Sequence, residues 1–401
     1  MHGETHSVEV AVVGGGPAGL TAAVALAAAG VDVALIAKTP PADNRTTALW
    51  SASVAAMEAL DVWPLCRDNA APLTAIRLID DTRRLIRAPE VTFEAREIGL
   101  AAFGHNIANR HLIAALDQRA AALPSLRRIE ATVTAVQPHD TGVTIRLDNG
   151  AAIEARLVVG ADGRKSLCRQ AAGIATNRRD YPQAALTLNL AHARPHNGIS
   201  TEFHTESGPF TLVPLPGQRS SLVCVTEPDE AEQLAALEAV ALSAEIERRA
   251  HSILGKMEVE DGRGLFPLGL EIARSFAARR IALTGEAAHV IPPIGAQGLN
   301  LGLRDVATIS ELVVEAKRDG RDAGGDDLLA RYDRMRHADV TGRTVAVDML
   351  NRSLLSDFLP VQASRGLGLY LIDRIAPLRR ALMREGVEPA DQPRLMRGEA
   401  L

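Results

Sequence analysis

The sequence is poor in aromatic side chains and in net charge, and each shortage argues against a class of partner. Aromatic residues make up only 3% of its 401 residues, which argues against a stacking platform for single-stranded nucleic acid. The 44 basic and 49 acidic residues leave a net charge of −5, so no overall positive field attracts a phosphate backbone. We therefore expect no nucleic-acid partner.

The chain is also poor in cysteine. Its three cysteines, Cys66, Cys168 and Cys224, are far apart and include no CxxC pair. Neither a disulfide scaffold nor a structural zinc site is therefore expected. We predict that each cysteine is a small, apolar, buried or half-buried side chain, and that the protein binds no metal.

Long hydrophobic runs are missing too. The uncharged, alanine-rich stretch from Ala18 to Val31, which follows a glycine-rich turn, is too short to cross a bilayer. The N-terminus holds Glu4 and Glu9 and no basic cluster, so a secretory signal is not expected. Hydrophobic residues at 47% and charged residues at 23% are typical of a globular protein. We expect a cytoplasmic protein.

What the sequence does contain begins with a βαβ pattern at the N-terminus. Val8 to Val13 is predicted to be a buried strand, Pro17 to Ala29 an alanine-rich helix and Val31 to Ile36 the next strand. A GxGxxG pattern in this strand–turn–helix setting is typical of dinucleotide binding. The turn before the helix has that pattern, with the sequence Gly14-Gly15-Gly16-Pro17-Ala18-Gly19.

Each glycine of the pattern has a separate function in such a turn. Gly14 permits the tight turn, Gly16 lets a pyrophosphate approach the backbone, and Gly19 lets the helix pack close to the strand. The helix N-terminus then offers free N–H groups and a positive dipole to the phosphates. The acid expected at the end of the second strand is missing, because Ala37 stands there. Either another group holds the ribose, or the adenosine is held mainly by its phosphates.

Two later motifs place a carboxylate after a buried strand. The first is GADG at residues 160–163, and the second is GEAAH at residues 285–289, followed by PPIGAQGLNLGLRD at residues 292–305. Ligands sit beyond the carboxyl ends of strands in open α/β sheets, so Asp162 and Glu286 are candidates to bind ligand hydroxyls. The glycine-rich entry to a helix in the last motif presents further backbone N–H groups.

The middle of the chain changes character. Residues 184–225 contain strand-like runs separated by proline and glycine, which predict an antiparallel sheet rather than further βα units. A polar helix is expected over residues 230–253, and the chain beyond residue 298 is helix-rich. Since this sheet separates the motifs, we expect two interleaved domains. They are a discontinuous cofactor domain (1–75, 100–180 and 265–345) and a substrate domain (76–99 and 181–264), and a C-terminal helical segment (346–401) follows them.

These ordered motifs resemble those of the FAD-dependent aromatic hydroxylases, the single-component flavoprotein monooxygenases. Within that group, DNRTTALW (43–50), FTLVPLPGQRSSLV (210–223) and GAQGLNLGLRD (295–305) are most similar to the ubiquinone-biosynthesis hydroxylases. The resemblance covers about residues 7 to 385. It implies an α/β fold with a Rossmann-like FAD-binding domain of the glutathione-reductase and 4-hydroxybenzoate-hydroxylase type. An interleaved, mostly antiparallel β substrate domain and a helical C-terminus would complete it.

The resemblance also implies which residues contact FAD. The glycine turn, with Pro17 and Ala18 inside it, would hold the pyrophosphate. Arg45 would lie near the phosphates or the flavin, and Arg110 near the FAD chain. Asp162 lies in a motif that the family associates with both FAD and NAD(P)H. The remaining contacts would be Glu286 with a ribityl hydroxyl, Pro293 with the flavin face, and Gly298, Leu299 and Asn300 with the isoalloxazine edge.

The chemistry of this family belongs to the flavin. The resemblance implies that NAD(P)H reduces FAD, that O2 adds at flavin C4a, and that the hydroperoxide hydroxylates a polyprenylated phenol or quinol precursor of ubiquinone. No catalytic side-chain set is expected. His204, on a predicted substrate strand, is a candidate base, and its alternative is an exposed or core histidine. Two other functions stay open: the same chemistry on a small soluble phenol such as a hydroxybenzoate, and a non-catalytic subunit of a quinone-biosynthesis complex.

Three positions depart from the family pattern. Ala37 replaces the usual ribose-binding Glu, which leaves the ribose without its acid. Glu286 stands where Asp is usual, and it keeps the charge on an arm longer by one methylene. Cys224 stands where related hydroxylases often have Trp, and it either reshapes the substrate pocket or replaces a core side chain neutrally.

The C-terminal segment combines leucines with arginines. One interpretation is a helix that rests on the inner face of a membrane, which would suit a polyprenylated substrate. The other is a helix that packs its leucines on the protein body and leaves its arginines in water. Other quinone-biosynthesis proteins are further candidate partners. The leucines of the segment 367–383 and the arginines in or beside it are Leu367, Leu371, Leu378, Leu382, Arg374, Arg379, Arg380 and Arg384.

Overall fold

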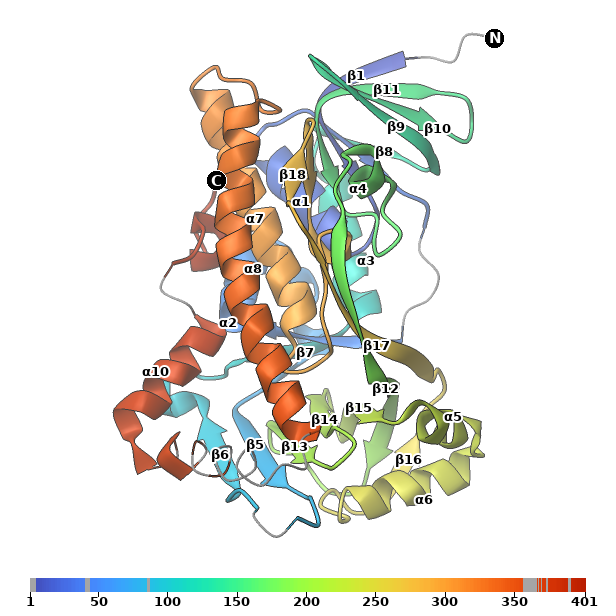
Figure 1. Ribbon diagram of the computed structural model, residues 1–401, viewed down its shortest axis with the longest axis vertical. Coiled ribbons are helices and arrows are strands. Elements are labelled where there is room, and N and C mark those ends of the chain that lie inside the picture. The colour runs from blue at the N-terminus through green and yellow to red at the C-terminus, as the bar shows by residue number, and fades with distance from the viewer. Residues whose placement is uncertain are drawn as a thin grey trace.

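The structure is a computed structural model that describes residues 5–39, 44–84, 87–355, 366, 368, 370–372, 374–388 and 391–401. Asp43 of the 43–50 stretch and Leu367 of the C-terminal segment lie outside the described residues. Figure 1 shows two main sheets, one toward each end of the longest axis. Two long helices, α7 (Gln297–Arg318) and α8 (Asp326–Leu355), run beside the first sheet toward the second.

The first sheet has eight strands and contains the βαβ unit predicted at the N-terminus. Its order is β18-β19-β11-β1-β2-β8, and the antiparallel strands β10 and β9 extend from β11. Pairing from β19 through β11, β1 and β2 to β8 is parallel. The strands are β1 (Thr5–Val13), β2 (Val33–Ile36), β8 (Leu126–Ile129), β9 (Val133–His139), β10 (Gly142–Leu147), β11 (Ala152–Gly160), β18 (Ala277–Ala278) and β19 (Ile281–Leu283).

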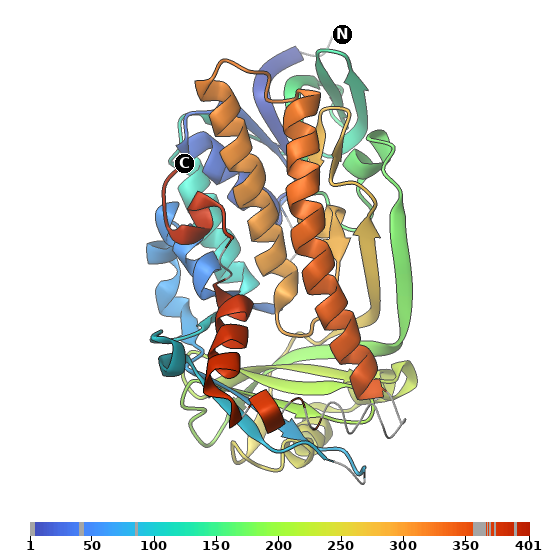
Figure 2. The ribbon, with the colours of Figure 1, turned by 60° about the vertical axis from the view of Figure 1, so that its left-hand side comes forward.

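Helix α1 (Pro17–Ala28) is buried between this sheet and two other helices. It contacts α3 (Asn109–Ala121) and α7, and α7 in turn contacts α8. Nine of its twelve residues are buried, as expected for a helix that is apolar all round. Figure 2 shows α7 and α8 side by side in orange, so these helices cover one side of the first sheet.

The second sheet has nine strands and is mostly antiparallel, which confirms the predicted fold class. Its order is β20-β17-β12-β15-β14-β13-β5-β6, with β16 also paired to β12. Only β13 and β5 pair in parallel among its described strands. The strands are β5 (Ala75–Asp80), β6 (Val91–Glu94), β12 (Thr176–His192), β13 (Ile199–His204), β14 (Pro209–Leu215), β15 (Arg219–Thr226), β16 (Met257–Val259), β17 (Gly264–Ala273) and β20 (His289–Val290).

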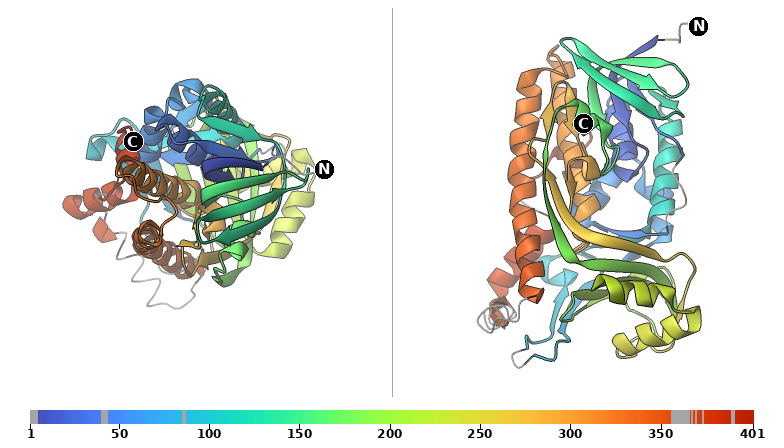
Figure 3. Two further views of the ribbon diagram at one scale, coloured as in Figure 1. Left: turned by 90° about the horizontal axis from the view of Figure 1, so that it is seen from above. Right: turned by 45° about the vertical axis from the view of Figure 1, so that its right-hand side comes forward.

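Two helices cover the outer face of this sheet, and the prediction of a single helix over residues 230–253 is wrong. The segment forms α5 (Pro228–Ala236) and α6 (Ala239–Arg249), because Leu237 and Glu238 adopt extended backbone between them. Leu234, Leu242 and Ile246 from these helices join the apolar cluster on that face. Figure 3 shows α5 and α6 lying across the second sheet, on the side away from the first.

The long strands β12 and β17 connect the two halves of the molecule. They pair with each other from Thr176–Ala273 to Thr187–Gly264, with an irregularity between Asp180 and Ala184. The proposed domain boundary at residues 180 and 181 therefore falls inside a continuous strand. The division of the chain into domains stays a prediction, and the strand–strand connection shows that the halves share backbone rather than a simple linker.

Shorter elements join the sheets. A three-stranded sheet has the order β3-β7-β4. Near the C-terminus of the chain, the helix α10 packs beside η3. No described helix is long and apolar enough to cross a membrane. These elements are β3 (Thr46–Trp50), α2 (Ser51–Ala59), η1 (Trp63–Leu65), η2 (Arg67–Asn69), β4 (Ala70–Pro72), η3 (Ala95–Ile98), β7 (Gly104–Ala108), α4 (Leu167–Ala171), η4 (Gly285–Ala287), α10 (Ala376–Val387) and η5 (Arg394–Arg397).

Candidate functional site

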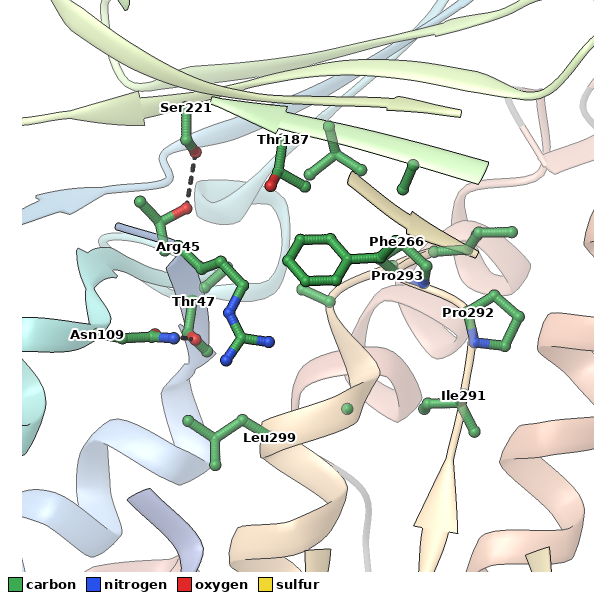
Figure 4. A pocket seen from close by; sticks show the side chains of 18 of the residues that line it. Arg45, Thr47, Asn109, Thr187, Ser221, Phe266, Ile291, Pro292, Pro293 and Leu299 are labelled. Carbon is green, nitrogen blue, oxygen red and sulfur yellow. Dashed lines mark hydrogen bonds between the residues drawn. The ribbon is translucent and has the colours of Figure 1, made fainter. Parts of the chain in front are cut away.

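One cavity of about 690 Å³ lies where the two sheets meet. Its wall combines the glycine turn, the segment at residues 44–50, one face of the second sheet and residues 284–299. Figure 4 shows Arg45, Phe266, Pro293 and Leu299 around this space, with the strands that carry Thr187 and Ser221 above it. Segments that are more than 250 residues apart in sequence thus form a single wall.

The glycine turn has the geometry that each glycine requires. Gly14 has φ +122°, and a Cβ atom there would lie 2.2 Å from the carbonyl oxygen of Ala161. A Cβ at Gly19 would lie 2.1 Å from the carbonyl oxygen of Gly14, so α1 packs tightly against the turn. By contrast, a Cβ at Gly16 would meet no heavy atom within 4 Å, because this residue faces the cavity. Gly14 and Gly19 therefore serve the fold, and Gly16 leaves room for a ligand.

The N-terminus of α1 is free to bind an anion. Gly16 is the N-cap residue and supplies no side chain, and the first turn holds no acidic residue. Its first N–H groups therefore lack an intrahelical partner and add to the positive end of the helix dipole. Gly16, Pro17, Ala18 and Gly19 all line the cavity, so a pyrophosphate fits here.

A second helix N-terminus opens on the same cavity. Helix α7 begins at Gln297 after Ala296, which has φ 52° and offers no capping side chain. Gly298 and Leu299 lie in the cavity wall, together with Pro293 from the preceding loop. The first N–H groups of α7 are therefore available to a carbonyl or anionic edge of a ligand.

The Asn300 side chain is used by the protein itself. Its Oδ1 atom accepts hydrogen bonds from the Trp50 N–H at 2.9 Å and the Ser53 hydroxyl at 2.7 Å. Its Nδ2 atom donates to the carbonyl oxygens of Ala48 at 2.8 Å and Ala296 at 2.6 Å. Asn300 is absent from the cavity wall, and its amide instead fixes the start of α7 against β3 and α2.

A buried ionic network holds the loop between β19 and α7. Asp305 is fully buried, and one of its oxygens accepts from the Gly285 N–H at 2.9 Å and from His289 Nε2 at 2.7 Å. Its other oxygen accepts from Arg336 Nε at 2.6 Å, and Arg336 also contacts Asp339 at 2.6 Å. Burial alone would raise the pKa of Asp305, but the charges of His289 and Arg336 outweigh it and lower that pKa.

The two strand-end carboxylates have different surroundings. Glu286 is exposed, lines the cavity and lies 3.5 Å from Arg164. Asp162 is half-buried and absent from the wall, and it accepts from the Ser166 hydroxyl at 2.5 Å and the Cys168 N–H at 3.1 Å. The structure therefore places Glu286 at the cavity, whereas Asp162 fixes the loop behind it.

Of the two candidate arginines, one lines the cavity and the other does not. Arg45 lines the cavity, and its guanidinium lies 5.6 Å from the centre of the Phe266 ring. Arg110 is exposed on α3 and absent from the wall, although its neighbour Asn109 is part of it. Asn109 accepts a hydrogen bond of 2.6 Å from the Thr47 hydroxyl, as Figure 4 shows.

The face of the second sheet that lines the cavity is largely apolar but carries several buried polar side chains, and His204 is one of them. Residues that alternate along β13 point to the cavity, and these include Glu202 and His204. His204 Nε2 lies 2.7 Å from a Glu202 oxygen, and the Thr211 hydroxyl donates to the other oxygen at 3.3 Å. His204, the candidate base, is only 3% exposed and lines the cavity, whereas its acidic partner Glu202 was not predicted. Their spacing of two along one strand was the available signal.

The three cysteines are all buried, as predicted. Cys224 belongs to the apolar cluster on the outer face of the second sheet and is absent from the cavity wall. Burial raises the pKa of its thiol to about 11. This placement favours the interpretation of Cys224 as a core residue over a reshaped pocket.

Comparison with known proteins gives matches along nearly the whole chain. Residues 7–346 match the sequence profile of the family described as FAD binding domain. The chain is 36% identical over 408 residues to the ubiquinone hydroxylase UbiL of Rhodospirillum rubrum, with 98% of this chain and 93% of that protein covered. It is 31% identical over 385 residues to the 3-demethoxyubiquinol 3-hydroxylase of Escherichia coli, covering 94% and 97%.

Solved structures show the same fold. The crystal structure of p-nitrophenol 4-monooxygenase PnpA from Pseudomonas putida superimposes with a TM-score of 0.79. The sequences are 19% identical, and the match covers 96% of this chain and 100% of that one. PqsL from Pseudomonas aeruginosa in complex with 2-aminobenzoylacetate gives a TM-score of 0.75 at 22% identity, covering 91% and 100%.

Proposed function

The chain belongs to the family of FAD-dependent aromatic hydroxylases, and on that premise we propose that it uses NAD(P)H and O2 to hydroxylate the ring of a polyprenylated phenol or quinol in ubiquinone biosynthesis. The observation that carries the proposal is the single cavity between the two sheets. One side of it presents the uncapped N-termini of α1 and α7. The other side is a largely apolar sheet face. A charged cofactor and an apolar substrate can therefore meet in one cavity.

The residues present fit FAD. We assign the pyrophosphate to the N–H groups of α1 beside Gly16, where the open space leaves room for it. Arg45 would add a positive charge near the phosphates or flavin, and Glu286 would accept a hydrogen bond from a ribityl hydroxyl. Pro293 would cover a flavin face, and the N–H groups at Gly298 and Leu299 would meet the isoalloxazine edge.

The remaining candidate residues would not contact FAD through their side chains, with the exception of Arg110, whose contact stays a prediction. The carboxylate of Asp162 and the amide of Asn300 already have partners within the protein, so each would position backbone next to the cofactor. Gly14 and Gly19 would shape the pyrophosphate turn. A contact of Arg110 with the FAD chain stays a prediction, since its side chain lies outside the described cavity wall.

When bound, FAD would supply the redox chemistry between NAD(P)H and O2. The protein side of the reaction is to bind, orient and exclude water. We propose that the Glu202 and His204 pair receives a hydroxyl of the substrate ring, with His204 accepting its proton and Glu202 orienting the imidazole. Leu73, Ile76 and Leu78 offer apolar surface to a prenyl tail.

Membrane contact through the C-terminal segment is a further part of the proposal. Met383 and Val387 of α10 pack on the protein body, whereas Leu371, Leu378 and Leu382 are each at least 40% exposed. These three leucines take little part in that packing, whereas Arg379 of the same helix is buried and pairs with Glu97. Exposed leucines beside arginines are typical of a helix that lies on an anionic membrane surface. A lipid substrate could then enter from the bilayer.

Two experiments test the proposal. Deleting the gene and analysing the cell's quinone lipids should show a prenylated ring that lacks one hydroxyl group. A normal quinone pool would contradict the assigned pathway. Purified protein should be yellow and should oxidise NAD(P)H faster with the accumulated lipid than with a hydroxybenzoate. A preference for the soluble phenol would favour the second function, and a colourless protein that takes up no FAD would favour the non-catalytic subunit.

A further inference from the structure

The acid that usually holds the FAD ribose is missing from this chain, and its position is occupied by a small buried residue. Ala37 follows β2 directly and is 7% exposed. A Cβ built on Gly15 would lie 2.8 Å from the Ala37 Cβ, so this position adjoins the glycine turn. A side chain at residue 37 therefore points toward the place where an adenosine ribose would lie, but alanine offers it no hydrogen-bond acceptor.

The neighbouring strand ends beside this position with a glutamate. β8 is the strand next to β2 at the edge of the first sheet, and the two are parallel with Ile36 paired to Ile129. The ladder continues by one residue, since the Ala37 N–H donates to the Ile129 carbonyl at 3.1 Å. Glu130 therefore stands next to Ala37. Partners in a parallel register point to the same face of the sheet, so the Glu130 side chain starts on the side of the glycine turn.

The Glu130 carboxylate turns back toward β2 rather than away from it. The Thr39 hydroxyl donates to Glu130 Oε1 at 3.2 Å, and Thr39 lies two residues beyond Ala37. Glu130 is exposed, and no ion pair to it is found within the described part of the chain. An ionised carboxylate has about four acceptor positions, so most of its capacity remains for a ligand. The strands are about 4.8 Å apart, a distance that a glutamate arm spans.

Another acid at this edge, Asp148, already has partners within the protein. Asp148 pairs with Lys38 at 2.9 Å and also accepts from the Thr132 N–H at 3.1 Å. We propose that Glu130, from the adjacent strand, replaces the missing acid and accepts hydrogen bonds from the hydroxyls of the FAD adenosine ribose. The inference rests on the proposed function, because it assumes that the glycine turn binds FAD. The proposed ligand of Glu130 is the adenosine ribose with both of its hydroxyls free of phosphate.

The test compares two flavins on the purified protein freed of its cofactor. The first is FAD, and the second is an FAD analogue whose adenosine ribose lacks both hydroxyls. Dissociation constants are measured by quenching of flavin fluorescence. The wild-type protein should bind FAD about tenfold to a hundredfold more tightly than the analogue, which is the range expected for hydrogen bonds to a charged group. Glu130→Gln and Glu130→Ala should lose most of that preference while binding the analogue as the wild type does.

The matched control is Asp148→Asn, which removes a negative charge from the same edge and should keep the wild-type preference. Thermal unfolding without flavin checks that each variant folds, and the exposed position of Glu130 predicts wild-type stability. A Glu130 variant that still discriminates the two flavins fully would overturn the assignment. Failure of the wild-type protein to bind either flavin would instead refute the proposed function, so the two failures are distinguishable.

Discussion

The substitution Gly16→Val separates cofactor binding from folding. Gly16 has φ −76° and ψ 174°, a conformation open to any residue, and its Cβ would meet no heavy atom within 4 Å. The valine should therefore fit the protein without its cofactor and change the free energy of unfolding by less than about 1 kcal/mol. The same open space is where the pyrophosphate would lie, so the isopropyl group should keep phosphate oxygens away from the N–H groups of α1.

The expected loss of FAD affinity in Gly16→Val follows from the hydrogen bonds to the pyrophosphate that would be lost. Each hydrogen bond to a charged group contributes about 1.5–3 kcal/mol, and loss of two would cost about 3–6 kcal/mol of binding free energy. That corresponds to FAD affinity weaker by about a hundredfold to ten-thousandfold. Flavin fluorescence titration of the cofactor-free protein measures the affinity, and thermal unfolding without flavin measures the stability.

Gly14→Ala is the variant to compare with Gly16→Val, because it should impair folding rather than FAD binding alone. Gly14 has φ +122°, and an added Cβ would lie 2.2 Å from the Ala161 carbonyl oxygen. This variant should be destabilised by about 1–3 kcal/mol or more even without flavin, because strain and overlap act in the fold itself. If Gly16→Val kept wild-type FAD affinity, or lost it only because the protein unfolded, the placement of the pyrophosphate would be wrong.

Three further predictions concern the buried groups. Asp305→Asn should lower the free energy of unfolding by about 3–5 kcal/mol in urea, because it removes a buried carboxylate that pairs with the buried Arg336 charge and leaves Asp339 to balance it; a loss below about 1 kcal/mol would contradict this. Although burial raises the pKa values of Asp305 and Asp339, the charges of His289, Arg336 and Arg304 outweigh it and lower both. Their stabilising contribution should be complete above about pH 4 and should be lost as pH falls through the folded-state pKa values, so a melting temperature unchanged by acid would argue against it. His204→Gln should lower kcat for substrate hydroxylation at least about tenfold while FAD binding stays intact. An unchanged kcat, measured from the amount of hydroxylated product, would rule out a role for His204 as proton acceptor.

Much of the cofactor half could be predicted because its signals are local. A buried run of valines, a glycine turn and an alanine-rich helix follow one another between residues 5 and 28, and each determines its own conformation. The alternating runs between residues 184 and 225 likewise became β12 to β15. The break at Leu237 was missed, because helix propensity on both sides is high and only the extended backbone at that residue separates the two helices.

The parts of the site that escaped prediction depend on pairing between distant segments. Arg336 meets Asp305 from another helix, and no spacing along the sequence indicates that contact. The motif placed Asn300 among the candidate cofactor contacts, yet its amide turns to the backbone of Ala48 and Trp50. Glu130 was passed over because only the register of β8 against β2 brings it beside Ala37. Sequence motifs therefore indicated several segments of the cavity wall, whereas strand register and helix packing decide which side chains face the cavity.

The most direct test of the central claim follows an oxygen atom. The purified, FAD-loaded protein is incubated with NAD(P)H, isotopically labelled O2 and the prenylated phenol that accumulates when the gene is deleted. We predict a product that carries one additional ring hydroxyl with the labelled oxygen, formed as NAD(P)H is consumed. A lipid that stays unchanged while NAD(P)H is not oxidised, or a hydroxyl whose oxygen comes from water, would contradict the assignment as a monooxygenase of ubiquinone biosynthesis.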